Sequence, residues 1–459
     1  MPTECNSETF EFQALNSRQV VARFDGGKIT SDGGGLLLRE TNRVTGVIEQ
    51  LAQCFWDGRD ARFVQYPVEQ LVAQRVYGLA LGYEDLNDHD EIREDELLGV
   101  LVEKSDSQEA LAGKSTLNRV ELTTHGRDRY KKVVVDEEAV ERFFVQMYLQ
   151  SRRRAPERII LDLDATDDPL HGKQEGRFFH GFHGCYCYLP LYIFSDDGYP
   201  LWAQLRRSNI DGAAGSKEAV EKIVEVIRQH WPKVKILLRA DSGFAREELM
   251  AWCEEHQVDY VFGLAKNPRL IRQIEDALEQ ARQEFEQTGK PARKFSDFTY
   301  ITCRSWSHAR RVIGKAEHLA KGSNPRFIVT SLSVSDYPAR DLYEQTYCRR
   351  GDMENRIKEQ QLALFSDRTS SSRMKANQLR LWFSTAAYLL IHQLRRLGLK
   401  GTNMARAQCD TIRLKLLKIG AQIKISVRRT LISLATGYPY ERIFAQVYRN
   451  LIRAGPIQT

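Results

Sequence analysis

Three acidic residues occupy positions at which side chains are held rigidly, and carboxylate oxygens are the ligands that hard divalent cations take. Asp164 ends the apolar stretch Arg158–Asp164, Asp241 directly follows the apolar stretch Val234–Ala240, and Glu354 lies in a segment with a helical pattern. Mg²⁺ prefers oxygen ligands, and converging carboxylates that hold two such ions about 3.5–4 Å apart support the cleavage of phosphodiester bonds. The three residues are therefore candidate ligands for this chemistry.

Each of these acids also has an ordinary structural interpretation. Asp164 could close a turn after its strand, and Asp241 could cap the helix that follows it. Glu354 could form an exposed ladder of ion pairs with Arg350 and Lys358, since residues four apart share one face of a helix. The identity of the acids does not decide between these interpretations and a metal site.

Asp162 is an alternative to Asp164 as the first ligand. The two are two residues apart on one expected strand, so their side chains point to the same face of the sheet. A buried acid costs free energy unless it is paired or bound to metal. We favour Asp164, because it lies at the end of the strand.

The elements around these acids follow the order strand, strand, strand, helix, strand, helix, strand and helix. This order predicts an α/β ribonuclease-H-like core with helices on both faces of a sheet. The expected strands are Arg158–Asp164, Tyr186–Ser195, Tyr199–Arg206, Val234–Ala240 and Tyr260–Ala265, and the expected helices are Lys217–His230, Arg246–His256 and Pro268–Gln287.

Four regions are expected along the chain. Residues 1–150 are mostly helical after a hairpin-like start, and residues 151–288 with 338–368 form the catalytic core. Residues 289–337 form a β-rich insertion subdomain, in which Phe298–Arg304, Arg311–Ala316 and Arg326–Ser331 are the expected strands. Residues 369–459 form a basic helical region that includes the expected helix Asn377–Leu397.

The positive charge of the chain is concentrated at its C-terminal end. The net charge of the whole chain is +6, but residues 369–459 contain 16 Lys or Arg and two acids, a net +14, which leaves −8 on the remainder. Lys and Arg contacts with phosphates supply much of the affinity of proteins for nucleic acids. We therefore expect a nucleic-acid partner, with a solvated basic helical domain as the alternative.

Several other classes of protein are excluded by the sequence. No run of eighteen apolar residues and no signal peptide occurs, which predicts a cytoplasmic protein without a membrane partner. The eight cysteines are scattered without a CxxC pair, which predicts reduced thiols. The segment Gly113–Thr116 resembles the end of a phosphate-binding loop, but Gln108 stands where that loop requires glycine. The acidic segment Glu84–Glu96 could bind metal, although an exposed helix and its flanking turn explain it better.

The three acids lie in motifs that resemble those of the group 1 DDE transposases of bacterial insertion sequences. The Tyr-x2-Arg-x3-Glu signature matches Tyr347, Arg350 and Glu354 without a gap, and the Asp-x-Gly-Phe motif begins at Asp241. The first motif, Asp-x-Thr, begins at Asp164. The N-terminal stretches GGKITSDGGGLLL and GYEDLNDHDEIR also resemble this group. One position departs from it, since Gln361 stands where the wider group often has a lysine.

The resemblance implies a DNA transposase. Asp164, Asp241 and Glu354 would ligate two Mg²⁺ ions, for which Mn²⁺ can substitute, and would cut and join DNA strands. The residues that would contact DNA are Tyr347, Arg349, Arg350, Lys358 and Trp306, the last by stacking on an unpaired base. The resemblance also implies that a homodimer acts on paired ends, with the terminal inverted repeats and the target as double-stranded DNA partners at the bacterial nucleoid.

Two other functions stay open on the sequence alone. A ribonuclease-H-like nuclease or resolvase would cut DNA without transferring strands. A transposase-derived protein with an inactive site would bind DNA without cutting it, although the presence of all three acids argues against this alternative.

Overall fold

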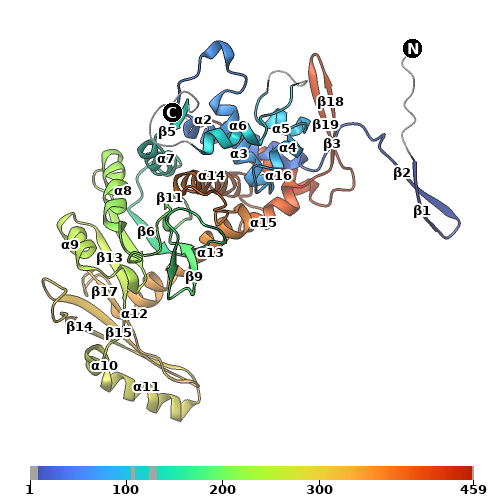
Figure 1. The fold of residues 1–459 in the computed structure, drawn as a ribbon. Coiled ribbons are helices and arrows are strands. Elements are labelled where there is room, and N and C mark those ends of the chain that lie inside the picture. Colours follow the sequence, from blue (N-terminus) through green and yellow to red (C-terminus); the bar gives the residue numbers. More distant parts are fainter. Residues whose placement is uncertain (1–8, 105–108, 123–131, 457–459) are drawn as a thin grey trace, which may run out of the picture.

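The computed structural model describes residues 9–104, 109–122 and 132–456, and its largest element is a nine-stranded mixed sheet (Figure 1). The strands lie in the order β11-β10-β6-β12-β13-β17-β15-β14, with β16 beside β15. Their bounds are β6 (Arg158–Ala165), β10 (Leu191–Ser195), β11 (Pro200–Gln204), β12 (Lys235–Ala240), β13 (Asp259–Leu264), β14 (Ala292–Tyr300), β15 (Arg310–Leu319), β16 (Gly322–Ser323) and β17 (Arg326–Thr330). The predicted mixed α/β class is confirmed.

The first half of the sheet contains both parallel and antiparallel pairs. Strand β12 pairs in parallel with β6 and with β13, whereas β10 runs antiparallel to β6 and to β11. Parallel neighbours need a crossover connection, which α9 (Glu247–Glu255) provides between β12 and β13. Helix α8 (Ser216–His230) precedes β12 and packs against α7 (Glu137–Gln150). These elements follow the order expected from the sequence.

Two of the expected elements are each divided in the structure. The expected strand Tyr186–Ser195 consists of β9 (Cys185–Tyr188) and β10, separated at Pro190, because proline has no N–H to donate to a strand ladder. The expected helix Pro268–Gln287 consists of α10 (Pro268–Gln273) and α11 (Glu275–Thr288).

Residues 289–337 extend the main sheet. Strand β17 pairs with β13 on one side and with β15 on the other, so the β-rich segment continues the sheet that carries β6 and β12. Strand β14 covers Ala292–Tyr300, earlier in the chain than the expected Phe298–Arg304. Helix α11 packs against β14 and β15 and forms, with them, the end of the molecule opposite the N-terminal hairpin (Figure 1).

The N-terminal and C-terminal regions pack together around helix α14 (Met374–Gln393). This helix is buried on nearly all sides, as expected for a helix that is apolar around its whole circumference, and it packs against α3 and β11. The other helices of this body are α1 (Leu36–Thr45), α2 (Val47–Ala52), α3 (Val68–Leu81), α4 (Asp88–Ile92), α5 (Glu96–Leu101), α6 (Lys114–Glu121), α15 (Cys409–Ile412) and α16 (Glu441–Ala454).

Short strands complete these regions, including one pair that was not expected. Strand β18 (Ala421–Ser426) pairs with β19 (Arg429–Leu434) and with β3 (Ile29–Thr30), so a hairpin lies within the C-terminal region that was expected to be helical. Strands β1 (Thr9–Leu15) and β2 (Arg18–Arg23) form a hairpin that projects from the body (Figure 1). Strand β4 (Phe55–Asp57) pairs with β5 (Val133–Val135).

Among the described residues, no helix combines the length and the apolar character needed to cross a membrane. The seven described cysteines are free thiols, and Cys5 and Gln108 lie outside the described residues.

Candidate active site

Two of the three predicted acids lie side by side at one edge of the sheet. Strands β6 and β12 are parallel neighbours, and their register pairs Leu163 with Ala240. Asp164 directly follows Leu163, and Asp241 directly follows Ala240. Both acids therefore lie at the carboxyl ends of these neighbouring strands. The alternation of buried apolar residues that forms these strands thus places the two carboxylates together.

Glu354 reaches this edge on an irregular helical segment. The segment consists of α12 (Ala339–Asp341), a π-helical turn (Leu342–Thr346), a 3₁₀ turn (Tyr347–Arg350), α13 (Gly351–Lys358) and a second π-helical turn (Glu359–Ala363). Arg239 of β12 donates to the carbonyl oxygen of Thr346 at 2.8 Å, and α13 packs against β6. Such local departures from α-helical winding are frequent at functional sites.

The charges of the three acids act on one another. Burial, together with the neighbouring charges of Asp241 and Glu354, raises the pKa of Asp164 to about 7. The guanidinium of Arg350 and the N–H of Ala165 act in the opposite direction. The predicted acids and the arginine of the third motif are therefore close enough to form one electrostatic cluster.

Within this cluster each acid also has a polar partner of its own. Asp241 Oδ1 accepts from the N–H of Gly243 at 2.8 Å, and Glu354 Oε1 lies 3.7 Å from Arg350 Nη1. Within residues 9–104, 109–122 and 132–456, no group of three His, Cys, Asp or Glu side chains is arranged to hold a metal ion. The donor set nevertheless fits Mg²⁺ or Mn²⁺, because it consists of carboxylate oxygens whose mutual repulsion a divalent cation would relieve.

Asp162 is engaged in a different interaction. Both of its carboxylate oxygens accept from Arg239, at 2.6 Å each, and both residues are only 2% exposed. A buried carboxylate needs such a partner, and this bidentate pair uses both oxygens. The arrangement favours Asp164 over Asp162 as the first ligand.

The predicted DNA contacts are placed differently from one another. Tyr347 is half-buried with the Arg350 guanidinium 5.7 Å from its ring centre, and the side chains of Arg349 and Lys358 are exposed. Trp306 is 8% exposed, lies edge-on to Tyr300 at 5.8 Å and has Arg310 over its ring. The indole is thus a packed aromatic, and stacking on a base would require it to leave this packing.

Gln361, which stands where the wider group often has lysine, has a structural role. Its side-chain N–H groups donate to the carbonyl oxygen of Asp167 at 3.1 Å and to the carboxylate of buried Asp168 at 2.8 Å. Burial raises the pKa of Asp168 to about 8. Gln361 therefore ties the end of the Glu354 segment to the chain that follows Asp164.

Sequence reasoning missed a buried network that anchors the same segment from its other side. Glu359, 5% exposed, binds Arg395, the N–H of Cys409 at 3.1 Å and the Cys409 thiol at 2.9 Å. Arg356 also donates to Glu359, at 2.9 Å. Nothing in the local pattern distinguishes Glu359 from an exposed helical glutamate. The arginine in VKILLRA was a usable signal for the pair with Asp162, because a charged residue inside an apolar strand needs a partner.

Gly263 of β13 leaves the space that Tyr347 occupies. A Cβ at this position would lie 2.7 Å from the Tyr347 hydroxyl, 2.8 Å from the N atom of Ser242 and 3.1 Å from the backbone carbon of Asp241. Two of these atoms are backbone and cannot move alone.

We therefore expect Gly263→Ala to displace Tyr347 or Asp241. Overpacking of this kind costs about 1–3 kcal/mol, and strand cleavage should fall with it. Urea unfolding and a cleavage assay would measure both effects. Gly99→Ala is the matched control, since a Cβ there has no atom within 4 Å; equal behaviour of the two variants would contradict the prediction.

The raised pKa of Asp164 predicts that stability depends on pH. An unfolded aspartate titrates near pH 3.9, and the native carboxyl titrates near 7. Between these values the native state retains a proton that the unfolded chain has lost, so stability falls as pH rises from about 4 to about 7. Asp164→Asn removes this penalty.

In EDTA we expect Asp164→Asn to melt above the native protein at about pH 8 and the difference to shrink toward pH 4. Thermal unfolding across this range tests the prediction. A difference that stays constant with pH would contradict it.

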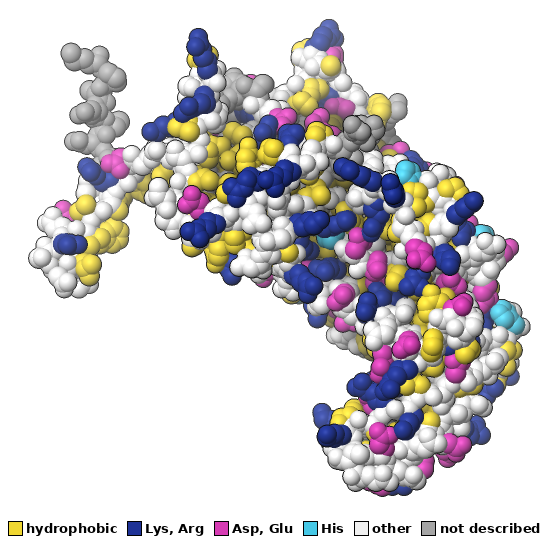
Figure 2. All heavy atoms as spheres, turned by 180° about the vertical axis from the view of Figure 1, so that it is seen from behind, with side chains coloured by type: hydrophobic (Ala, Val, Ile, Leu, Met, Phe, Trp, Pro, Cys, Tyr) yellow, Lys and Arg dark blue, Asp and Glu magenta, His cyan; other side chains and the backbone are white. Residues whose placement is uncertain are grey.

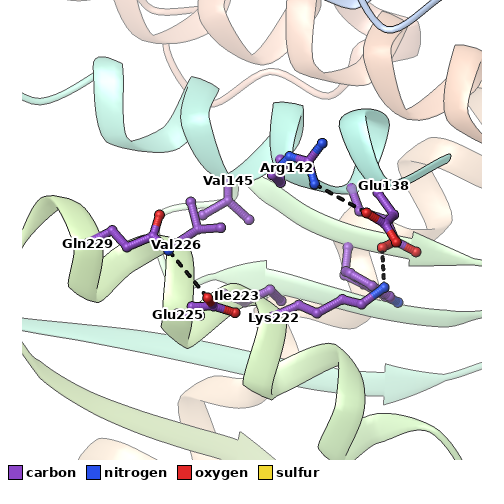
Figure 3. Close-up of a pocket in the computed structure, with 10 residues that line it drawn as sticks. Glu138, Arg142, Val145, Lys222, Ile223, Glu225, Val226 and Gln229 are labelled. Carbon is purple, nitrogen blue, oxygen red and sulfur yellow. Dashed lines mark hydrogen bonds and ion pairs between the residues drawn. The ribbon is translucent and has the colours of Figure 1, made fainter. Parts of the chain in front are cut away.

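A pocket of about 320 Å³ lies between α7 and α8, away from the carboxylates (Figure 3). Four of its charged side chains form two pairs, Arg142 with Glu138 and Lys222 with Glu141, and Val145 and Ile223 supply apolar surface. None of the predicted site residues lines it. The pocket therefore has no part in the candidate active site.

In the segment Gly113–Thr116, which resembled a phosphate-binding loop, the backbone and side chain of Lys114 bind the carboxylate of Asp90. Asp90 accepts from the N–H of Lys114 at 2.8 Å, at the start of α6, and its other oxygen lies 3.3 Å from Lys114 Nζ. The acidic segment Glu84–Glu96 is paired elsewhere too, since Arg368 lies 2.9 Å from Glu84. Both segments therefore have structural ion pairs, which fits a helix start for Gly113–Thr116 and an exposed helix with its flanking turn for Glu84–Glu96.

The basic C-terminal region places most of its charge on the surface. Lys424, Arg428 and Arg429 are exposed on the β18–β19 hairpin, and Arg442 and Arg449 are exposed on α16. Figure 2 shows Lys and Arg side chains spread densely over the body of the molecule on one face. This distribution suits a polyanionic partner.

Comparison with known proteins identifies the class of protein that this fold and site belong to. The family described as "Transposase DDE domain group 1" matches residues 12–456, nearly the whole chain. The chain therefore belongs to the group 1 family of DDE transposase domains, whose activity is DNA transposition.

The structure "Cryo-EM structure of piggyBac transposase synaptic complex with hairpin DNA" is similar at 12% identity and a TM-score of 0.40, over 93% of this chain and 86% of that chain. No curated protein matches this chain.

Proposed function

We propose that this protein cleaves the ends of an insertion sequence and transfers the freed strands to target DNA. The observation that carries the proposal is the placement of Asp164 and Asp241 at the ends of two adjacent parallel strands, with Glu354 on a helix that packs against β6. Membership of the DDE transposase family indicates the class of reaction, which is DNA transposition.

The core is proposed to be ribonuclease-H-like. The sheet order β11-β10-β6-β12-β13, with β12 and β13 parallel to β6 and β10 antiparallel to it, supports this assignment. In such a core the first and second acids stand on neighbouring central strands, as Asp164 and Asp241 do.

Asp164, Asp241 and Glu354 are the residues that would hold two divalent ions. Such ions, when bound, activate a water or a DNA 3′-hydroxyl and stabilise the leaving oxygen. Arg350 neutralises the carboxylate cluster and, with exposed Arg349 and Lys358, holds the DNA phosphates. Tyr347, packed against β13 beside Asp241, fixes the helical segment at the strand edge.

The partners are proposed to be double-stranded DNA, as terminal inverted repeats and as target, and a second copy of the chain on paired ends. The exposed cations of the C-terminal region support the DNA partner. Because α14 packs against α3, the basic region and the N-terminal helices form one body that could contact the repeats.

Strand cleavage and joining on DNA that carries the ends of the element test the function. The native protein should cut and join in Mg²⁺ and do neither in EDTA. Cleavage without joined products would indicate a nuclease or resolvase, and DNA binding without cleavage in Mg²⁺ or Mn²⁺ would indicate an inactive derivative.

A further inference from the structure

A small sheet beside the carboxylate cluster carries aromatic side chains on its surface. Strand β9 lies between β7 (Asp168–Pro169) and β8 (Phe178–His180). Phe182, in the turn of the β8–β9 hairpin, is 89% exposed, and Phe179 and Tyr186 are 57% and 45% exposed. Exposed aromatic groups of this density generally mark a binding surface.

The turn of this hairpin is open on its outer side. A Cβ on Gly181 or on Gly184 would meet no atom within 4 Å, and the N–H of Gly184 donates to the carbonyl oxygen of His180 at 2.8 Å. The turn is therefore closed by its own backbone hydrogen bond, while the Phe182 ring, edge-on to His183 at 5.1 Å, stands in solvent.

Contacts hold the hairpin between the two elements that carry the first and third acids. His183 Nδ1 lies 3.2 Å from Asp167 Oδ1, and Asp167 is three residues after Asp164, a span of at most about 10 Å. Asp168, at the base of the sheet, accepts from Gln361 of the Glu354 segment at 2.8 Å. Figure 1 shows β9 in the region of β6 and α13. DNA cut at the carboxylates would pass within reach of Phe182.

The charge around the hairpin indicates what kind of molecule the aromatic surface meets. Arg207, exposed, pairs through its backbone with Tyr188 at the end of β9, and Lys173 is exposed in the segment between β7 and β8. The guanidinium of Arg177 lies 4.5 Å from the centre of the Tyr186 ring. Aromatic rings interleaved with cations are the combination that holds unpaired nucleotides, because any base can stack on a ring while the cations meet the phosphates. A purely apolar patch would instead favour a second copy of the chain.

We propose that Phe182 stacks on an unpaired base of the DNA next to the phosphodiester bond that is cut, and that Lys173 and Arg177 hold the backbone of that strand. The proposal rests on the proposed function and deepens it, since it assigns a site for unpaired bases to the hairpin rather than to Trp306, which is packed in the structure.

Phe182→Ala and Phe182→Trp, compared with the native protein, test the proposal. Binding would be measured by fluorescence anisotropy in EDTA, so that no strand is cut, on two probes made from an end of the element: a blunt duplex and the same duplex with its last base pairs mismatched. Val334→Ala is the control, since Val334 is 59% exposed and lies in the loop after β17, outside the regions proposed to contact DNA.

We expect Phe182→Ala to weaken binding of the mismatched probe on the order of tenfold and to bind the blunt duplex with near-native affinity. Val334→Ala should bind both probes as the native protein does. Phe182→Trp should restore the native affinity. An equal loss on both probes, or no loss on either, would overturn the proposal. So would a change of molecular mass in light scattering without DNA, which would mark the hairpin as a contact between copies.

The results distinguish a failure of this proposal from a failure of the proposed function. If the native protein neither binds nor cuts DNA from the element, both fail. If it cuts and joins that DNA while Phe182→Ala binds the two probes as the native protein does, only the role of the hairpin is wrong.

Discussion

Glu354→Gln and Asp241→Asn should each reduce strand cleavage in Mg²⁺ by on the order of a thousandfold, equivalent to about 4 kcal/mol of transition-state stabilisation. Both changes keep the size of the side chain and remove a negative charge from the cluster around Asp164. Because Glu354 is half exposed and its contact with Arg350 is long, at 3.7 Å, Glu354→Gln should fold and bind DNA as the native protein does.

The matched control for Glu354 lies on the same helix. Asp352, two residues earlier in α13, is exposed and lies on a different face of the helix from Glu354. Asp352→Asn should cut at the native rate when both variants are assayed on the same DNA. If Glu354→Gln also retained the native rate, Glu354 would be an ion-pair residue and the site assignment would be wrong.

Asp162→Ala should destabilise the fold by about 3–5 kcal/mol, the cost of leaving a buried charge without its partner. The change would leave the buried Arg239 guanidinium with only the Thr346 carbonyl oxygen as acceptor. The free energy of unfolding in urea measures the effect. Loss of stability should accompany loss of cleavage, because Arg239 also holds the helical segment that carries Glu354.

Two further variants show whether the charge pair itself is responsible. The double change Asp162→Leu with Arg239→Met should recover much of the lost stability, since an apolar pair of similar volume replaces a buried ion pair at little cost. Glu279→Ala, which breaks an exposed pair with Arg282 on α11, should leave stability unchanged. A double variant as unstable as Asp162→Ala would contradict the charge-pair explanation.

The sequence predicted the strand ends well because hydrophobic patterning acts locally. The runs that form β6 and β12 are short, apolar and followed at once by an acid, so their existence and the placement of Asp164 and Asp241 could be predicted without knowledge of the fold. The order of elements around them is likewise a local property, and the structure follows it.

The features that could not be predicted depend on contacts between distant segments. The attachment of residues 289–337 to the main sheet through β17, and the burial of Glu359 against Arg395 and Cys409, arise only after the chain has folded. The β18–β19 hairpin was not predicted, because the basic composition of this region is equally compatible with a helix. Trp306 was proposed to meet DNA because of its type and its neighbours, and its burial against Tyr300 is a tertiary effect.

The pairing of β3 with β18 has a consequence for the order in which the protein can be made. Residue 30 pairs with residue 421, and α1 and α3 pack against α14, so the N-terminal helices cannot cover all of their apolar surface until most of the chain has been synthesised. At about 5–20 residues per second, the ribosome takes roughly 20–80 s to add the residues between these two strands. During that time the nascent N-terminal region exposes surface that chaperones bind. Native folding is therefore completed only near the end of translation, and truncated chains that lack the C-terminal region should be found in aggregates rather than as folded fragments.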